Sequence, residues 1–161
     1  GDALFLRNRV ISRLEQAELQ PVRELRRWLT TFVVVGGGFS GVETAGELVD
    51  FLHASLRYYR NIDREDLRIV LLHSGDRLVP ELSASLGAFT LKRLKRDVDV
   101  RLNARAVRVT DRAVHLDNGD IIEGGTVVCT IGTQPNPLLE EIPAKKERGR
   151  LVVRPRRARP R

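Results

Sequence analysis

Apolar positions in the first part of the chain follow two different periods. Within residues 4–18 they recur at the spacing of one helical face, which predicts an amphipathic helix. A shorter helix is expected to start at Pro21, because proline suits the first helical turn. Residues 31–35 (TFVVV) form a β-branched apolar run, which predicts a buried strand of a parallel sheet.

The alternation of helical and strand patterns continues to residue 131. The expected later helices lie at about 41–59 and from a cap at Ser83 to near 96, with a polar turn at 63–66. The expected later strands lie at 67–73, 98–102 and 126–131, and shorter ones at 106–110, 113–116 and 121–123. Strands that alternate with helices predict a parallel sheet with right-handed crossovers. The three short strands, with an Asn-Gly turn between the last two, predict an antiparallel β-meander over one face of that sheet.

A glycine cluster joins the first strand to the long helix and carries the clearest chemical signal. Its spacing is G-x-G-x-x-G, which serves a tight turn, the approach of a pyrophosphate to the backbone, and close packing of helix on strand. The helix start adds unpaired N–H groups and the positive end of a dipole. The motif predicts an α/β, Rossmann-like parallel sheet flanked by helices, and dinucleotide binding; a glycine turn that only reverses the chain is the alternative. The candidate contact residues are Gly36, Gly37, Gly38, Phe39, Ser40 and Gly41.

The end of the second strand should carry an acidic residue that binds the ribose of the dinucleotide. The residue there is His73, followed by Ser74, Asp76 and Arg77. We therefore include His73, Ser74 and Arg77 among the cofactor-binding candidates, with a partly exposed histidine without a ligand role as the alternative. Because no acid repels a 2′-phosphate at the strand end, the expected preference for NADH over NADPH is small, about 1–2 kcal/mol.

Composition and charge narrow the class of protein. The 161 residues are 42% hydrophobic and 30% charged, typical of a globular domain, and no apolar run approaches the length of a membrane span. The net charge of +7 comes from residues 144–161, which hold nine basic residues and one acidic residue. This tail lacks aromatic residues for base stacking, so we expect it to be disordered and to bind no specific nucleic acid. The absence of methionine suggests a piece of a longer protein.

Three stretches of sequence resemble a known family. They are FVVVGGGFSGVETAGEL (32–48), IVLLHSGDRLVPELS (69–83) and VVCTIGTQPNPLL (127–139). Over residues 4–153 the chain resembles the flavin-dependent pyridine-nucleotide oxidoreductases, and most of all the type II NADH dehydrogenase branch. The resemblance implies the NAD(H)-binding domain of a flavoprotein that passes hydride from NADH to FAD and electrons to a quinone.

The resemblance also implies roles for residues outside the glycine cluster. Glu43 matches the Glu of the family's G-V-E, near the nicotinamide carboxamide, and is the candidate catalytic residue; a helix-start carboxylate stabilised by the helix dipole is the alternative. Thr130, Ile131 and Gly132 match a family turn that passes beside the dinucleotide. Cys129 is expected to be a small core residue, because one cysteine cannot form the redox pair of related disulfide reductases. His53 and His115 lack partners at metal spacing, so no metal site is expected.

The domain organisation follows from these assignments. We expect residues 1–30 to be a helical lead-in from a missing FAD domain, 31–142 the NAD(H)-binding domain, and 143–161 the tail. FAD is expected only in the full-length parent, so the fragment alone should be inactive. The domain is expected in the cytoplasm, and its parent peripheral on the inner face of the membrane. A homodimer is compatible with these expectations. The alternatives are a stand-alone dinucleotide-binding module without turnover, or a domain of a ferredoxin or rubredoxin reductase-like flavoprotein.

Overall fold

The computed structural model describes residues 2–132, 137–147 and 150–153, which fall into two compact units, the first ending at Ile131 and the second beginning at Gly132. In chain order, the first unit contains α1 (Asp2–Glu18), α2 (Arg23–Leu29), β1 (Thr31–Val35), α3 (Phe39–Ser55), the 3₁₀ turns η1 (Leu56–Tyr58) and η2 (Arg64–Asp66), β2 (Arg68–Leu72), α4 (Ala84–Leu94), β3 (Asp99–Arg101), β4 (Ala106–Val109), β5 (Ala113–Leu116), β6 (Ile121–Glu123) and β7 (Thr126–Cys129). The second unit contains α5 (Leu138–Glu141), β8 (Lys146–Glu147) and β9 (Arg150–Leu151).

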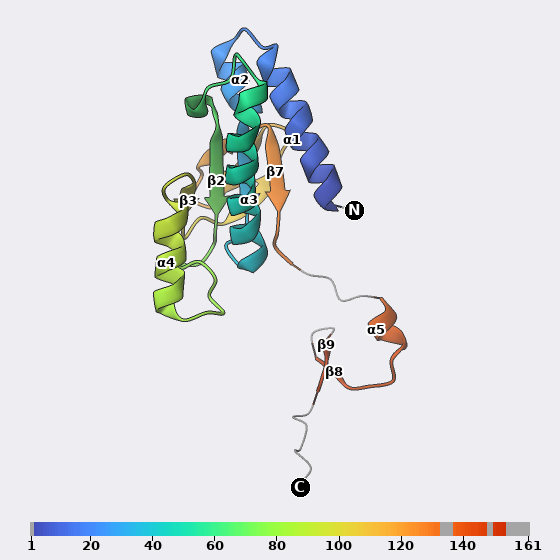
Figure 1. Cartoon of the computed structure of the whole chain (residues 1–161). Coiled ribbons are helices and arrows are strands. Elements are labelled where there is room, and N and C mark those ends of the chain that lie inside the picture. The colour runs from blue at the N-terminus through green and yellow to red at the C-terminus, as the bar shows by residue number, and fades with distance from the viewer. Residues whose placement is uncertain (1, 133–136, 148–149, 154–161) are drawn as a thin grey trace, which may run out of the picture. The chain divides into compact units, whose positions relative to one another are not determined.

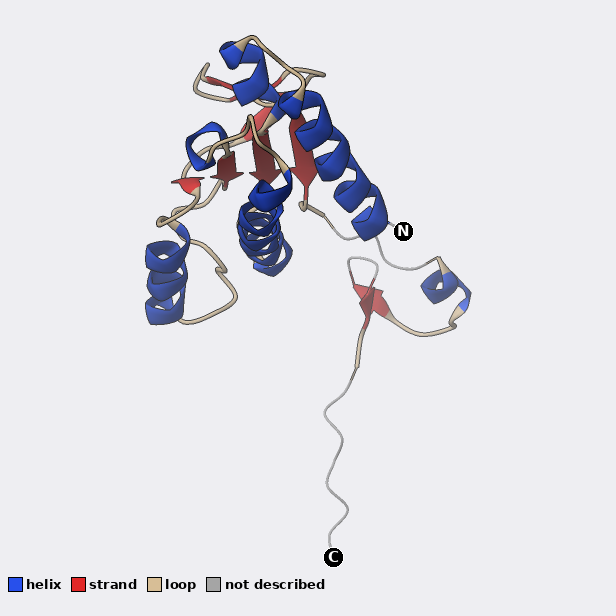
Figure 2. Ribbon diagram, turned by 45° about the horizontal axis from the view of Figure 1, so that its top comes forward, coloured by secondary structure: helices blue, strands red, loops and turns tan. Residues whose placement is uncertain are grey.

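A parallel sheet with strand order β3-β2-β1-β7 forms the centre of the first unit (Figure 1). β1 is an inner strand that pairs with β2 on one side and with β7 on the other. Val33 of β1 lies opposite Val70 of β2 and opposite Val127 of β7. Helices α1 and α3 lie beside this sheet (Figure 2), and β4, β5 and β6 form a separate antiparallel sheet. The α/β prediction, with its flanking helices and its antiparallel insertion, is confirmed.

The two faces of the parallel sheet bury different partners because successive side chains of a strand point to opposite faces. Phe32 and Val34 of β1 belong to a core cluster that includes buried residues of α1 and α3. Val33 and Val35 belong to a second cluster that includes Val114 of the antiparallel sheet. The β-meander therefore covers the face opposite to the helices, and β1 is buried along its whole length.

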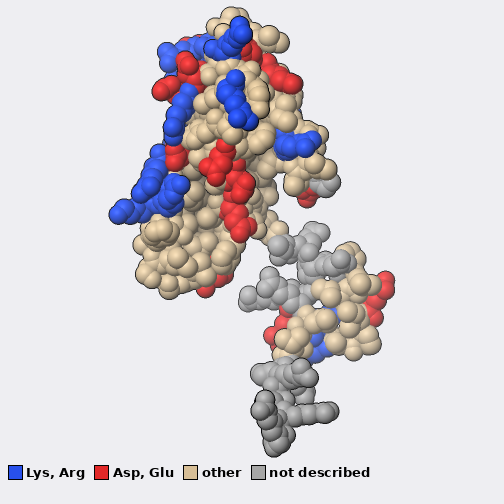
Figure 3. Space-filling model, viewed as in Figure 1, with Lys and Arg blue, Asp and Glu red and all other residues tan. Residues whose placement is uncertain are grey.

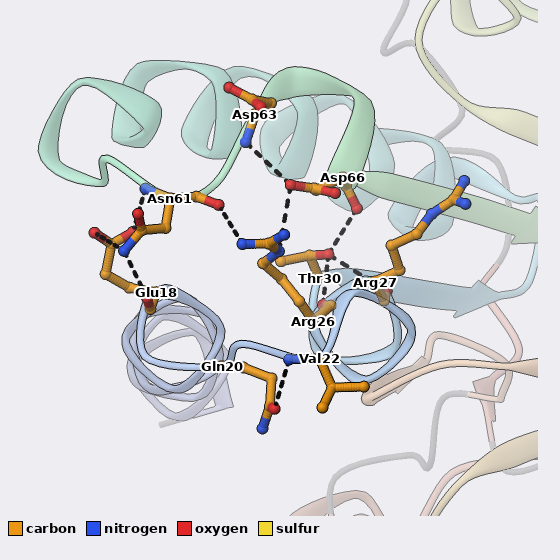
Figure 4. Close-up of polar contacts among 9 residues, drawn as sticks. All are labelled: Glu18, Gln20, Val22, Arg26, Arg27, Thr30, Asn61, Asp63 and Asp66. Carbon is orange, nitrogen blue, oxygen red and sulfur yellow. Dashed lines mark hydrogen bonds and ion pairs between the residues drawn. The ribbon is translucent and has the colours of Figure 1, made fainter.

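A network of polar contacts ties the first two helices to the chain at the amino-terminal edge of the sheet (Figure 4). The Thr30 hydroxyl donates to the backbone oxygen of Asp66 at 2.6 Å, and Arg26 Nη1 donates to the oxygen of Asn61 at 2.8 Å. The Glu18 carboxylate accepts the backbone N–H of Asn61 at 3.0 Å. Residues 2–30, expected as a lead-in, thus belong to the same compact unit as the sheet.

The helix boundaries differ slightly from the prediction. The second helix begins at Arg23, with Val22 as its N-cap residue, so the prediction that it starts at Pro21 is wrong. The long helix begins at Phe39 and ends at Ser55, before a 3₁₀ turn. The cap predicted at Ser83 is confirmed, because its hydroxyl accepts the N–H of Leu86.

Two other features depart from the sequence analysis. Cys129 is exposed rather than in the core; it is the last residue of β7, which among the described strands pairs with β1 alone. The segment expected as a disordered tail, 143–161, contains the antiparallel pair β8 and β9, while residues 154–161 lie outside the described residues. The first compact unit ends at Ile131, and the expected domain boundary at 142 stays a prediction.

Candidate functional site

The loop between β1 and α3 has a shape that two of its glycines make possible. Gly36 has a φ of +120°, a backbone conformation that side chains with a Cβ rarely adopt. A Cβ on Gly41 would lie 1.7 Å from the backbone oxygen of Gly36 and 2.9 Å from Thr130 Oγ1. The helix can therefore approach the strand this closely only with glycine at position 41.

The other two glycines of the motif differ in what surrounds them. The backbone N–H of Gly37 donates to His73 Nδ1 at 3.1 Å, and a Cβ there would lie 2.6 Å from His73 Cγ. A Cβ on Gly38 would have one atom of the described residues within 4 Å, Glu81 Oε1 at 3.9 Å, apart from its neighbours along the chain. Gly38 is also the N-cap residue of α3, and no side chain caps this helix end. One side of Gly38 is therefore open to a ligand that approaches the backbone.

The carboxyl ends of the parallel strands surround a pocket of about 250 Å³ beside this loop. We call it the loop pocket. The candidates that the sequence analysis placed at a dinucleotide site and that line the pocket are Gly36, Gly37, Gly38, His73, Ser74, Thr130 and Ile131. Ligands of open α/β sheets bind at this edge, outside the carboxyl ends of the strands.

Thr130 directly follows β7 and is held in a fixed position beside the loop. Its backbone N–H and its hydroxyl both donate to the oxygen of Val35 at 2.9 Å. These bonds continue the pairing of β7 with β1 by one residue and hold Ile131 at the wall of the pocket. Gly132 has a φ of +80° and belongs to the second compact unit.

Several predicted site residues lie elsewhere. Arg77 Nη2 donates to the backbone oxygen of Pro80 at 2.6 Å, and Arg77 is not among the residues that line the loop pocket. Phe39 is exposed. Ser40 and Glu43 line a separate groove between α1 and α3.

Glu43 belongs to the outer surface of α3 rather than to the loop pocket. α3 carries the exposed acidic residues Glu43, Glu47 and Asp50, and Figure 3 shows acidic surface over this helix. The structure therefore brings the glycines, His73 and Thr130 together around the loop pocket. It leaves Glu43 outside this pocket, on the side of α3 that lines the groove with α1.

Sequence reasoning missed a group of residues that line the pocket: Pro80, Glu81, Ala104, Arg105 and Ala106. The last three follow β3, the third strand of the parallel sheet. The signal that could have identified them is topological, because a parallel sheet brings the carboxyl end of every strand to the same edge. They add one basic residue, Arg105, to the residues that line the pocket.

Within residues 2–132, 137–147 and 150–153 the structure brings together no group of three or more His, Cys, Asp or Glu side chains suited to a metal ion. Across the same residues, none of the helices has the combined length and apolar character needed to cross a membrane.

The sequence of the chain is similar to those of known oxidoreductases. A family model described as pyridine nucleotide-disulphide oxidoreductase matches residues 4–158. The chain is 33% identical over 166 residues to the type II NADH:quinone oxidoreductase NdhA of Mycobacterium tuberculosis, covering 96% of this chain and 35% of that protein. It is 36% identical over 121 residues to the Ndh protein of the same organism, described by the same activity, covering 74% of this chain and 26% of that protein.

A solved structure shares the fold. It is that of NDH2 from Plasmodium falciparum in complex with NADH, with a TM-score of 0.78 and 24% identity, covering 88% of this chain and 31% of that one. The chain spans about a quarter to a third of the length of the curated relatives that it matches.

Proposed function

The chain belongs to the pyridine nucleotide-disulphide oxidoreductase family, and from that premise we propose that its first unit is the NAD(H)-binding part of a type II NADH dehydrogenase-like flavoprotein. The observation that carries the proposal is the open side of Gly38 at an uncapped helix start, in a pocket at the carboxyl edge of the sheet. A pyrophosphate fits such a place because the backbone can approach it closely and the helix dipole favours negative charge.

The chain's own residues would bind and orient the dinucleotide. The backbone around Gly38 and the first turn of α3 would hold the pyrophosphate, with Gly36 and Gly41 keeping the loop in shape. Thr130 and Ile131 would line the path of the dinucleotide. Glu43 remains the candidate for orienting the nicotinamide. NADH, when bound, supplies a hydride, for which the acceptor in this family of proteins is a flavin.

The activity of the longer protein is the second part of the proposal. Relatives named as NADH:quinone oxidoreductases support FAD as the hydride acceptor and a quinone as the final acceptor. We propose that FAD binds to a part of the parent outside this chain, and that the parent is peripheral on a membrane, where quinones dissolve. On this basis the chain alone binds the dinucleotide without turnover.

The test is a calorimetric titration of the chain with NADH, compared with Gly38→Val. The substituted side chain would occupy the open side of Gly38, so the dissociation constant should rise at least tenfold, about 1.4 kcal/mol or more. Gly46→Val is the matched control, because a Cβ at Gly46 meets no atom within 4 Å and Gly46 does not line the loop pocket. Absence of NADH binding by the original chain, or equal affinity in a folded Gly38→Val variant, would refute the proposal.

A further inference from the structure

The two residues of the loop pocket that directly follow β2, His73 and Ser74, carry no carboxylate. His73 follows β2, where an acid would bind the hydroxyls of an adenosine ribose. Its Nδ1 accepts the N–H of Gly37 at 3.1 Å, so this nitrogen is engaged in holding the glycine loop. Ser74, the next residue, is exposed and lines the pocket with a hydroxyl group. His73 and Ser74 therefore offer hydrogen-bonding groups without a negative charge, and the exposed Asp76 further along the segment is not among the residues that line the pocket.

A positive charge lies next to this end. The backbone N–H of Ala104 donates to the oxygen of His73 at 2.8 Å, and that of Asn103 donates to the oxygen of Gly75 at 2.9 Å. These two bonds fix the chain after β3 along the segment that follows β2. Arg105 comes directly after them and lines the same pocket as His73 and Ser74.

The Arg105 side chain is available to a ligand. It is 67% exposed, and its Nε lies 4.0 Å from Asp117 Oδ2, a long separation for an ion pair between exposed groups. Such a pair is weak, whereas a guanidinium binds a phosphate with two parallel hydrogen bonds. The carboxylate of the pocket, Glu81, lies near Gly38 rather than along the bonded segment of His73 and Ala104. Arg77, the other arginine near the strand end, donates to the oxygen of Pro80.

We propose that this end of the loop pocket accepts a 2′-phosphate on the adenosine ribose and that Arg105 binds it, so that the chain takes NADPH as well as NADH. The proposal rests on the proposed function, since it assumes that the dinucleotide lies in the loop pocket. It makes Arg105 a residue that sets cofactor specificity: the guanidinium contacts a group that NADPH carries and NADH lacks. It also assigns His73 to the glycine loop instead of to the ribose hydroxyls.

The experiment compares NADH and NADPH by calorimetric titration of the original chain, Arg105→Gln and Arg96→Gln. Arg96 is an exposed arginine outside the loop pocket and controls for the loss of one positive charge. We expect the original chain to bind NADPH within about thirtyfold of NADH, the range set by a difference of about 2 kcal/mol. Arg105→Gln should lower the affinity for NADPH relative to NADH at least tenfold, and Arg96→Gln should leave the ratio within twofold.

A smaller pair of probes isolates the phosphate itself. Adenosine 2′,5′-bisphosphate and 5′-AMP differ only in the 2′-phosphate, so the same change in their ratio should follow Arg105→Gln. Circular dichroism and thermal melting establish that the variants are folded.

The outcomes separate the two proposals. NADH binding without NADPH binding, or an equal loss of both cofactors in Arg105→Gln, overturns the assignment of Arg105 and leaves the proposed function in place. A ratio that falls as much in Arg96→Gln as in Arg105→Gln also overturns it, because the effect is then one of net charge. Absence of binding by both cofactors overturns the proposed function and this inference with it.

Discussion

Gly41 and Gly46 lie in the same helix, and the structure predicts opposite effects for the same substitution at the two positions. A Cβ at Gly41 would lie 1.7 Å from the oxygen of Gly36, 2.8 Å from its carbonyl carbon and 2.9 Å from Thr130 Oγ1. A Cβ at Gly46 would meet no atom within 4 Å. Gly41→Ala therefore overpacks the crossing between loop and helix, whereas Gly46→Ala only replaces a poor helix former by the best one.

The magnitude follows from these distances. Contacts of a Cβ closer than about 3 Å are not tolerated, so the start of α3 and the Gly36 carbonyl must separate by about 1 Å or more. The two nearest atoms, the oxygen and the carbon of that carbonyl, belong to the backbone and cannot turn aside as a side chain could. Overpacking of this kind costs about 1–3 kcal/mol, against a gain of up to about 1 kcal/mol from helix propensity. We expect Gly41→Ala to lose about 1–2 kcal/mol of unfolding free energy and Gly46→Ala to gain about 0.5–1 kcal/mol.

Urea denaturation followed by circular dichroism measures both free energies, and NADH titration follows the site. Gly41→Ala should weaken NADH binding at least tenfold, because the displaced loop no longer presents its backbone to the pyrophosphate. Gly46→Ala should bind NADH as the original chain does. A Gly41→Ala variant at least as stable as Gly46→Ala would refute the reasoning, since the close approach of helix and strand would then not need glycine.

Two further predictions concern charge. His73→Glu places a carboxylate at the end of β2 and should raise the preference for NADH over NADPH at least tenfold, because a carboxylate at this position accepts ribose hydroxyls and repels a 2′-phosphate, neither of which the histidine does; an unchanged ratio would show that position 73 does not lie beside the ribose. Burial raises the pKa of Asp99, whereas hydrogen bonds and positive charge from Arg101 and Arg68 lower it. The lowering effects together are larger than the effect of burial, so the pKa lies below its ordinary value. The ionised Asp99 therefore stabilises the fold above the ordinary carboxyl pKa of about 4, and this contribution is lost as the pH falls through the lowered value. Thermal melts of Asp99→Asn should show a lower melting temperature than the original chain at pH 7 and a difference that shrinks as the pH falls below the ordinary carboxyl pKa; a difference that is independent of pH would contradict this account.

Local signals were enough to predict the central part of the fold. The run from Thr31 to Val35 has the composition of a buried parallel strand, and the glycines after it leave few conformations other than a tight turn into a helix. The hairpin at Asn118 and the cap at Ser83 likewise depend on residues within a few positions of each other. Each of these elements is set by backbone geometry and hydrophobic period, which the sequence carries directly.

Other features depend on which segments meet in three dimensions. Cys129 is exposed at the end of β7, which among the described strands pairs with β1 alone, although its apolar neighbours suggested a buried site. The direction of Glu43 depends on how α3 is rotated on the sheet, and this sets it in the groove with α1 instead of in the loop pocket.

Arg105 shows the same dependence most clearly. No local pattern connects it to a glycine motif more than sixty residues earlier in the chain. It reaches the loop pocket because β3 pairs in parallel with β2, which brings the carboxyl ends of both strands to one edge. The sequence by itself determined the glycine loop between β1 and α3, since that loop is built from consecutive residues. Only the tertiary structure decided which charged side chain stands beside it, because strand pairing and not sequence distance brings that side chain there.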